Sequence, residues 1–172
     1  MKIGLLSDTH SYLDPKVFQY FESCDEVWHA GDIGDLRVAS ALQSFRPLRA
    51  VYGNIDDKTI QVHYSEDLHF KCEGVEVLIT HIGGKPPSYN SRVKKLLNQL
   101  KPQLFICGHS HLLGITRDPN LNNMLFVNPG AAGNHGFHSM KTLVRFELLS
   151  GQIKNMEVIE LGKRGKIDTG EM

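Results

Sequence analysis

Seven side chains that could bind metal ions occur in five short fragments of this sequence. The fragments are Asp8-Thr9-His10, Gly31-Asp32, Gly53-Asn54-Ile55-Asp56, His81-Ile82-Gly83-Gly84 and Gly108-His109-Ser110-His111. The candidate donors within them are Asp8, His10, Asp32, Asn54, His81, His109 and His111. A mixed set of oxygen and nitrogen donors without cysteine favours Mn, Fe, Zn, Co or Ni over Mg or Ca. This set is large enough for two ions.

Each fragment lies where an apolar run ends, so each is expected at the end of a strand. In open α/β sheets, ligands bind beyond the carboxyl ends of the strands, and the five fragments could therefore meet at one rim. Asp8 and His10 are two residues apart, as are His109 and His111, and this spacing directs both members of a pair to one side. Asp32 carries two carboxylate oxygens and could bridge two ions.

The elements that must position these fragments follow from the apolar pattern. The first third alternates strands and helices, which implies a parallel sheet with crossover helices. We expect strands at 3–6, 26–30 and 48–52 and helices at 15–23 and 36–45. Later we expect a hairpin (67–72, 75–80), a helix (91–100), a strand (104–107) and antiparallel strands (112–117, 125–127, 141–149, 152–161). Two mixed sheets packed face to face, with helices outside, would bury these runs.

Length and composition set broad limits. The 172 residues suffice for one domain, 1–172, of which the polar segment 163–172 is expected to be a flexible tail. Lys plus Arg (19) equals Asp plus Glu (19), so there is no strong nucleic-acid signal. Three separated cysteines fit a reducing compartment, and no apolar stretch resembles a signal peptide or a membrane span. We expect a cytoplasmic protein with no membrane partner.

Two metal ions about 3.5–4 Å apart are a standard device for hydrolysing phosphate esters, because they clamp the attacking and leaving oxygens. A water whose pKa is lowered toward about 7 by the metal can supply the nucleophile.

The five fragments resemble the signature of the calcineurin-like metallophosphoesterases over nearly the whole chain. The length and the Gly-Asn-x-Asp fragment resemble the small prokaryotic YfcE-like phosphodiesterase branch. The resemblance implies a four-layer αββα sandwich, two divalent ions (with Mn favoured) and hydrolysis of a small phosphate ester by a hydroxide that bridges the metals. One ion would take Asp8, His10, Asp32 and His111; the other would take Asp32, Asn54, His81 and His109. The resemblance, together with exposed edge strands, also allows a homo-oligomer.

One position departs from this resemblance. Many members have a histidine after the metal-binding asparagine that helps to protonate the leaving group, but here that position is Ile55. General acid–base help is typically worth about 10²–10⁴-fold, so this site should be slower or depend on good leaving groups. Asp56 is expected to orient a ligand or the Asn54 loop.

The remaining polar and aromatic candidates are expected to be structural or exposed. We expect His29 to be buried and hydrogen-bonded, Trp28 to lie in the core, and His63 and His69 to lie at the surface. For Lys85 and Arg92 a solvated face is favoured over phosphate contact. Substrate contact stays open for the histidines of the glycine-rich loop that follows residue 127, His135 and His138.

Three functions are compatible with these residues. The leading one is a dinuclear metal-dependent phosphodiesterase in which Asp32, Asn54 and His109 act through the metals. The second is a phosphomonoesterase for a small metabolite or nucleotide, which the absence of a histidine at position 55 disfavours. The third is a non-catalytic interaction module, since the retromer subunit of this fold is a known relative.

Overall fold

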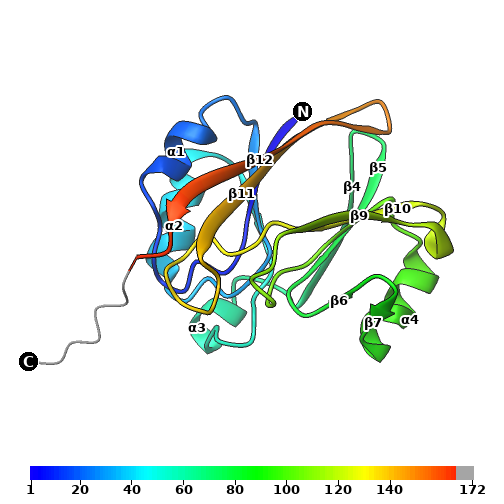
Figure 1. Cartoon of the computed structure of the whole chain (residues 1–172), viewed down its shortest axis with the longest axis horizontal. Helices are drawn as coiled ribbons and strands as arrows, with labels where there is room; N and C mark the ends of the chain where they lie inside the picture. The colour runs from blue at the N-terminus through cyan, green and yellow to red at the C-terminus, as the bar shows by residue number, and fades with distance from the viewer. Residues whose placement is uncertain (166–172) are drawn as a thin grey trace, which may run out of the picture.

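Two five-stranded mixed sheets lie face to face in this computed structural model, which describes residues 1–165 of the chain. The first sheet has the order β12-β11-β1-β2-β3 and the second the order β4-β5-β8-β10-β9 (Figure 1). The first contains β1 (Lys2–Leu6), β2 (Glu26–His29), β3 (Leu48–Ala50), β11 (Met140–Leu149) and β12 (Gln152–Lys163). The second contains β4 (Asp67–Cys72), β5 (Val75–Thr80), β8 (Leu104–Ile106), β9 (Gly114–Asp118) and β10 (Met124–Asn128).

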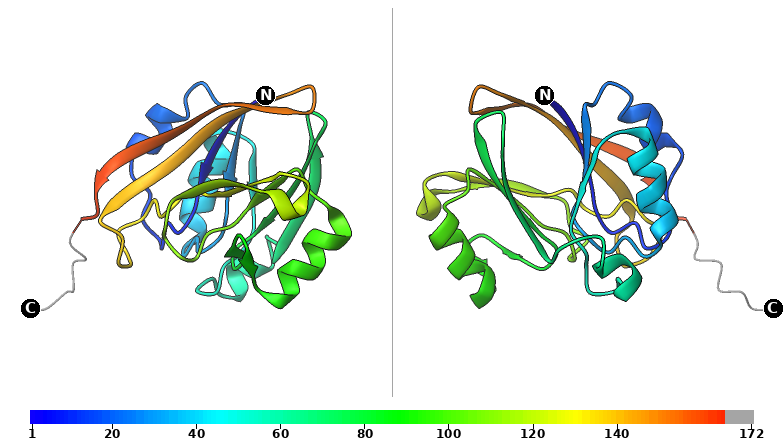
Figure 2. Two further views of the ribbon diagram at one scale, coloured as in Figure 1. Left: turned by 45° about the vertical axis from the view of Figure 1, so that its right-hand side comes forward. Right: turned by 180° about the vertical axis from the view of Figure 1, so that it is seen from behind.

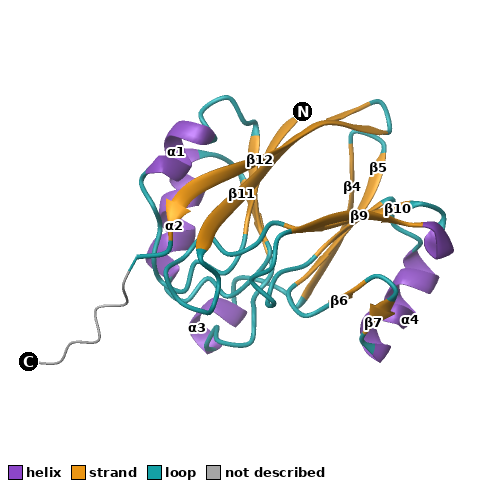
Figure 3. Ribbon diagram, viewed as in Figure 1, coloured by secondary structure: helices purple, strands orange, loops and turns teal. Residues whose placement is uncertain are grey.

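Helices cover the outer face of each sheet. The helices α1 (Lys16–Tyr20) and α2 (Leu36–Phe45) lie on the first sheet, and α4 (Ser91–Leu100) lies on the second (Figures 1 and 3). A short α3 (Lys58–Gln61), a 3₁₀ turn (Pro119–Leu121) and a small hairpin of β6 (Gly84–Lys85) and β7 (Ser88–Tyr89) complete the described chain.

Three apolar clusters separate four layers, which confirms the predicted αββα sandwich. The central cluster lies between the sheets and includes the fully buried Trp28. A second cluster joins the first sheet to α1 and α2 through residues such as Phe21 and Leu42. A third joins the second sheet to α4 through Phe105 and Leu97. The molecule is therefore held together by one inter-sheet core and two helix–sheet cores.

Local sequence signals fix the two longer helices. The Asp35 side chain caps α2 by accepting a hydrogen bond from the backbone N–H of Arg37, and Asn90 caps α4 by accepting one from Val93. Lys101 adopts the left-handed conformation at the end of α4, directly before Pro102. No helix among residues 1–165 is long and apolar enough to cross a membrane.

The direction of β10 corrects a prediction and matters for function. Strand 125–127 was expected among antiparallel strands; β10 is indeed antiparallel to β9, but it runs parallel to β8. Each sheet thus contains three mutually parallel strands: β1, β2 and β3 in one, and β5, β8 and β10 in the other. The loops that follow these six strands form one end of the molecule (Figure 2).

Smaller differences concern the boundaries of elements. Within the predicted tail 163–172, Lys163 is the last residue of β12 and the Arg164 N–H donates to the Ser139 carbonyl, so both residues belong to the ordered sheet edge. The rest of the predicted tail, 166–172, lies outside the described residues. The strand expected from residue 112 begins at Gly114, so Leu112 and Leu113 belong to the loop after β8.

Candidate metal centre

Six of the seven candidate donors form two triads at the rim. Within each triad, one ligand atom per residue lies within 4.8 Å of the other two. We call Asp8, His10 and His111 the first triad, and Asp32, His81 and His109 the second triad. Each triad combines loops from both sheets, so the site exists only because the two sheets pack together.

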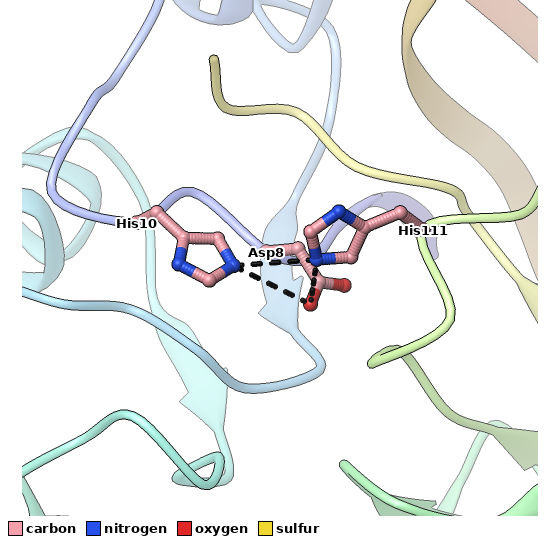
Figure 4. Close-up of side chains that lie close together, drawn as sticks. All are labelled: Asp8, His10 and His111. Carbon is pink, nitrogen blue, oxygen red and sulfur yellow. Dashed lines mark hydrogen bonds and ion pairs between the residues drawn. The ribbon is translucent and has the colours of Figure 1, made fainter. Parts of the chain in front are cut away.

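The first triad converges on a single point (Figure 4). The Nε2 atoms of His10 and His111 are 3.3 Å apart. Asp8 Oδ1 lies 3.1 Å from Nε2 of His111 and 4.0 Å from Nε2 of His10. Two imidazole nitrogens and a carboxylate oxygen in this arrangement suit a divalent transition ion.

Asp32 faces both triads with different oxygen atoms. Its Oδ1 lies 3.2 Å from Nε2 of His81, and its Oδ2 lies 3.5 Å from Nε2 of His10. The Asp32 side chain is 3% exposed, so its charge is held away from bulk water. This carboxylate is thus positioned between the two groups of donors.

The backbone at the donors is unusual. Asp8, His10, Asp32, His109 and His111 all have positive φ angles, between 46° and 68°. Non-glycine residues rarely adopt this left-handed conformation, and its clustering at functional sites is a known use of local strain. The donors with this conformation lie in the loops directly after β1, β2 and β8.

Backbone hydrogen bonds between neighbouring loops hold this conformation. The N–H groups of Asp8, His10 and Gly108 donate to the carbonyls of Gly31, Asp32 and His81, respectively, each at 3.0 Å. Close packing adds to them: a Cβ at Gly53 would lie 2.1 Å from Asp32 Oδ1. A side chain other than hydrogen is therefore excluded at position 53.

Two buried polar residues brace the donor loops from behind. Asp56 accepts hydrogen bonds from the N–H groups of Ile33, Gly34 and Gly53, which joins the Asp32 loop to the Asn54 loop. His29 is fully buried, as predicted; its Nδ1 accepts from Gly31 N–H, and its Nε2 lies 2.9 Å from Thr9 Oγ1. Burial lowers the pKa of His29 to about 4, so the ring is neutral.

Burial and nearby charged side chains shift the pKa values of the triad residues in different directions. Burial lowers the pKa of His10, although Asp32 and Asp8 oppose it. For His81, burial acts to lower the pKa, but the adjacent Asp32 and Asp8 carboxylates outweigh it and the pKa is raised. For Asp32, burial acts to raise the pKa, but His81 outweighs it and the pKa is lowered.

The donor set fits a cation on two further observations. Within residues 1–165, Asp8 Oδ1 and His81 Nε2 are buried and form no hydrogen bond of good geometry. Other donors of the triads lie close to them: His111 Nε2 is 3.1 Å from Asp8 Oδ1, and Asp32 Oδ1 is 3.2 Å from His81 Nε2. His81 Nδ1 donates to the Ala30 carbonyl at 2.8 Å, which leaves Nε2 as the atom that faces the site. A second-nitrogen hydrogen bond of this kind is usual for metal-binding histidines.

A sixth loop, residues 129–139, reaches the rim because it follows the parallel strand β10. The ring of His135 stacks on His10 with centroids 4.8 Å apart, and the ring of His138 contacts His111 edge-on at 5.2 Å. His138 is buried, and its Nε2 lies 3.0 Å from the Gly133 carbonyl. The sequence signals of its proximity were its glycine-rich composition and its place directly after a predicted strand.

The other candidates are distributed as follows. Asn54 lies on the loop beside Asp32, but its side chain is exposed and no hydrogen bond among residues 1–165 ties it to either triad. Ile55 is 44% exposed, and its N–H donates to Asp32 Oδ1 at 3.1 Å. Arg92 pairs with Asp67 and Glu66, away from the triads. His63 and His69 lie outside both triads.

The family follows from a match over most of the sequence. Residues 1–151 match the model of the calcineurin-like phosphoesterase superfamily domain. The chain belongs to this superfamily. The superfamily is one of metal-dependent phosphate-ester hydrolases, which agrees with two groups of metal-compatible donors at the rim.

Known proteins similar to this metallophosphoesterase domain include archaeal sequences and more distant folds. A probable metallophosphoesterase of Methanothermobacter thermautotrophicus is 28% identical over 136 residues, covering 76% of this chain and 77% of the relative. A structure described as a novel archaeal phosphodiesterase has a TM-score of 0.77 at 22% identity, covering 94% and 100% of the two chains. Wild-type Vps29 of Entamoeba histolytica, in complex with zinc, has a TM-score of 0.63 at 19% identity, covering 93% and 99%. At these identities the two structures establish a shared fold.

Proposed function

We propose that this chain is a dinuclear metal-dependent phosphoesterase and that phosphodiesters are its preferred substrates. The observation that carries the proposal is the position of Asp32, whose two oxygens face His81 of the second triad and His10 of the first. A carboxylate in this position can bridge two closely spaced ions, one through each oxygen.

We assign the first ion to Asp8, His10, Asp32 and His111, and the second to Asp32, Asn54, His81 and His109. Bound there, the ions would polarise the phosphoryl oxygens and lower the pKa of a water so that it can attack phosphorus. A transition ion is favoured over Mg²⁺, because four of the seven donors are imidazoles. Among the transition ions we propose manganese, with Ni, Zn, Fe and Co as the alternatives.

Residues around the triads would position the metal ligands and the substrate. Asp56 and the backbone hydrogen bonds keep the donor loops in place, so the donors need little rearrangement when the ions bind. His109 is exposed at the rim and can reach both an ion and a substrate oxygen. Ile55 cannot give a proton to the leaving group, so we expect activated or diester substrates to react best.

The test is hydrolysis by protein purified without chelator and reconstituted with Mn²⁺, Zn²⁺ or Mg²⁺. Bis(4-nitrophenyl) phosphate reports diesterase activity and 4-nitrophenyl phosphate reports monoesterase activity. We expect the diester to give the higher kcat/KM, chelation to abolish hydrolysis, and Mn²⁺ to restore it better than Mg²⁺. Equal rescue by Mg²⁺ would contradict the histidine-rich ligand set.

The same experiment separates the alternatives. A higher kcat/KM for the monoester would favour a phosphomonoesterase. Bound metal without hydrolysis of either ester would favour a non-catalytic interaction module, a function suggested by the similarity in fold to Vps29.

A further inference from the structure

A cavity of about 730 Å³ opens beside the second triad. His109 and Gly108 form its edge nearest the metal centre. The size is within the range of small-molecule sites, about 300–1,000 Å³. Its continuity with His109 places any molecule bound in it next to the reacting phosphate of the proposed function.

The lining of this cavity is mainly apolar. Leu112, Leu113 and Ile115 line it and are 65%, 44% and 38% exposed, while Phe126 lines it at 4% exposure. Single exposed leucines need no explanation, but three large apolar side chains within four residues, around one cavity, indicate a binding surface. Lys85 is the only lining residue with a full charge at neutral pH, and no carboxylate within residues 1–165 forms an ion pair with it.

The walls of the cavity are braced before any ligand binds. The β6–β7 hairpin forms one wall, and the Tyr89 hydroxyl ties it to β9 by donating to Asp118 Oδ2 at 2.8 Å. Elsewhere in the lining, Asn128 Nδ2 donates to the Gly108 carbonyl at 2.9 Å and to Ser110 Oγ at 3.0 Å, which fixes the loop after β8. A preformed cavity of this kind binds without the loss of free energy that ordering a loop would require.

We propose that this cavity binds the organic group of the substrate, and that the enzyme therefore selects phosphate esters with a bulky apolar group, such as an aromatic ring. This inference rests on the proposed function, since it places the phosphate at the two triads. Small polar esters would leave the apolar wall in contact with water. The positive charge of Lys85, which pairs with no carboxylate of the described residues 1–165, also favours an anionic ligand over an uncharged hydrocarbon.

Binding can be measured without turnover. Protein labelled at leucine and isoleucine methyl groups and loaded with Zn²⁺ is titrated with 1-naphthylphosphonate or with methylphosphonate, neither of which has an ester bond to hydrolyse. We expect the methyl signals of Leu112, Leu113 and Ile115 to shift with the naphthyl compound and to change little with the methyl compound. Signals that do not move with either compound would overturn the proposal.

Substitutions give a matched comparison. Leu112→Asn and Ile115→Asn change exposed positions and should each weaken naphthylphosphonate binding by about 5- to 10-fold. Leu149→Asn, at a 51% exposed position on the distant β11–β12 hairpin, should leave it unchanged. The two cavity variants should lower kcat/KM for bis(4-nitrophenyl) phosphate by a similar factor, while the control retains it. Equal binding by all three variants would overturn the inference.

The outcomes distinguish this inference from the proposed function. Naphthyl-dependent shifts without hydrolysis of any ester would support the cavity and contradict the enzyme. Hydrolysis without such shifts would support the enzyme and overturn the cavity assignment. Methyl shifts that depend on protein concentration alone would assign the surface to a second copy of this chain and would also overturn it.

Discussion

The two triads offer similar donors in very different surroundings. The first, with Asp8 and two histidines, is enclosed by the loop after β10, whose His135 and His138 contact its rings. The second has its innermost ligand, His81, 2% exposed, and opens through His109 to an apolar cavity. One side of the site is thus lined by polar rings and the other by aliphatic side chains. Under the proposed function, each half would bind one metal ion through similar donors, while the cavity beside the second half would select the substrate.

The largest expected effect is at the residue that both halves share. Asp32→Ala should reduce the bound metal at both triads and lower kcat/KM by about 10³-fold or more, because several kcal/mol of charge stabilisation are lost. Metal content by mass spectrometry and diester hydrolysis measure the two effects. Glu160→Ala, at an exposed position on β12, is the control and should behave as wild type. Near-wild-type turnover by the Asp32 variant would contradict a shared carboxylate.

Two glycine substitutions should separate the halves. A Cβ at Gly136 would lie 2.1 Å from His111 Nδ1, and one at Gly31 would lie 2.6 Å from His81 Nδ1; both glycines have positive φ. Gly136→Ala should therefore weaken the first site, and Gly31→Ala the second, each by about 10- to 100-fold in metal affinity. Metal titrations should show one weakened site in each variant. Equal weakening of both sites by either substitution would mean that the glycine acts through the shared Asp32 and not through the histidine beside it.

An ion pair next to the first triad joins two of the loops that surround it, and among residues 1–165 it has no equally buried counterpart beside the second triad. Asp14 follows the His10 loop and Lys141 follows the His138 loop, and their buried side chains meet at 2.7 Å. Burial acts to raise the pKa of Asp14, but the hydrogen bond from Lys141 outweighs it and the pKa is lowered. Asp14→Asn leaves a buried lysine unpaired and should lower the free energy of unfolding by about 3 kcal/mol at pH 7.

The pH dependence of this pair has a definite sign. Because the folded pKa of Asp14 is below its ordinary value of about 3.9, the stabilisation is complete above that value and is lost as the pH falls through the folded pKa. Denaturant unfolding of wild type and Asp14→Asn should therefore converge at acidic pH. The double variant Asp14→Asn/Lys141→Met removes the unpaired charge and should recover much of the loss. A difference that does not shrink as the pH falls below the ordinary pKa of an aspartate would contradict the pair as its source.

The smallest expected effect concerns Ile55. With no proton donor at this position, log kcat/KM should fall steeply as the pKa of the leaving group rises in a series of aryl and alkyl esters. Ile55→His, at a 44% exposed position, should help only the poor leaving groups, and by no more than about 10-fold. A flat dependence in the unmodified protein would mean that another group supplies the proton, with His135 and His138 the first to test.

The sequence predicted the fold well where apolar runs end in polar fragments. Strand ends at residues 6, 30 and 80 were predicted because Asp8, Asp32 and His81 follow them closely; β1 and β5 end as predicted, and β2 ends one residue earlier, at His29. The sheet assignment of β10 was not predictable, because a run of four apolar residues, Met124 to Val127, carries no sign of its direction. The position of the loop that follows β10 was therefore not fixed, and whether its residues His135 and His138 contact the substrate stayed undecided. The cavity was also not predicted, because Leu112 and Leu113 fit a strand pattern until the chain direction at His111 is known.

The central claim is that two metal ions share Asp32. Titration of the metal-free protein with Mn²⁺, followed by electron paramagnetic resonance, tests it most directly, since ions about 3.5–4 Å apart are magnetically coupled. We expect two Mn²⁺ per chain with a coupled spectrum in the wild type, and no coupled spectrum in Asp32→Ala. A single bound ion, or two ions with the spectrum of isolated Mn²⁺, would contradict the account.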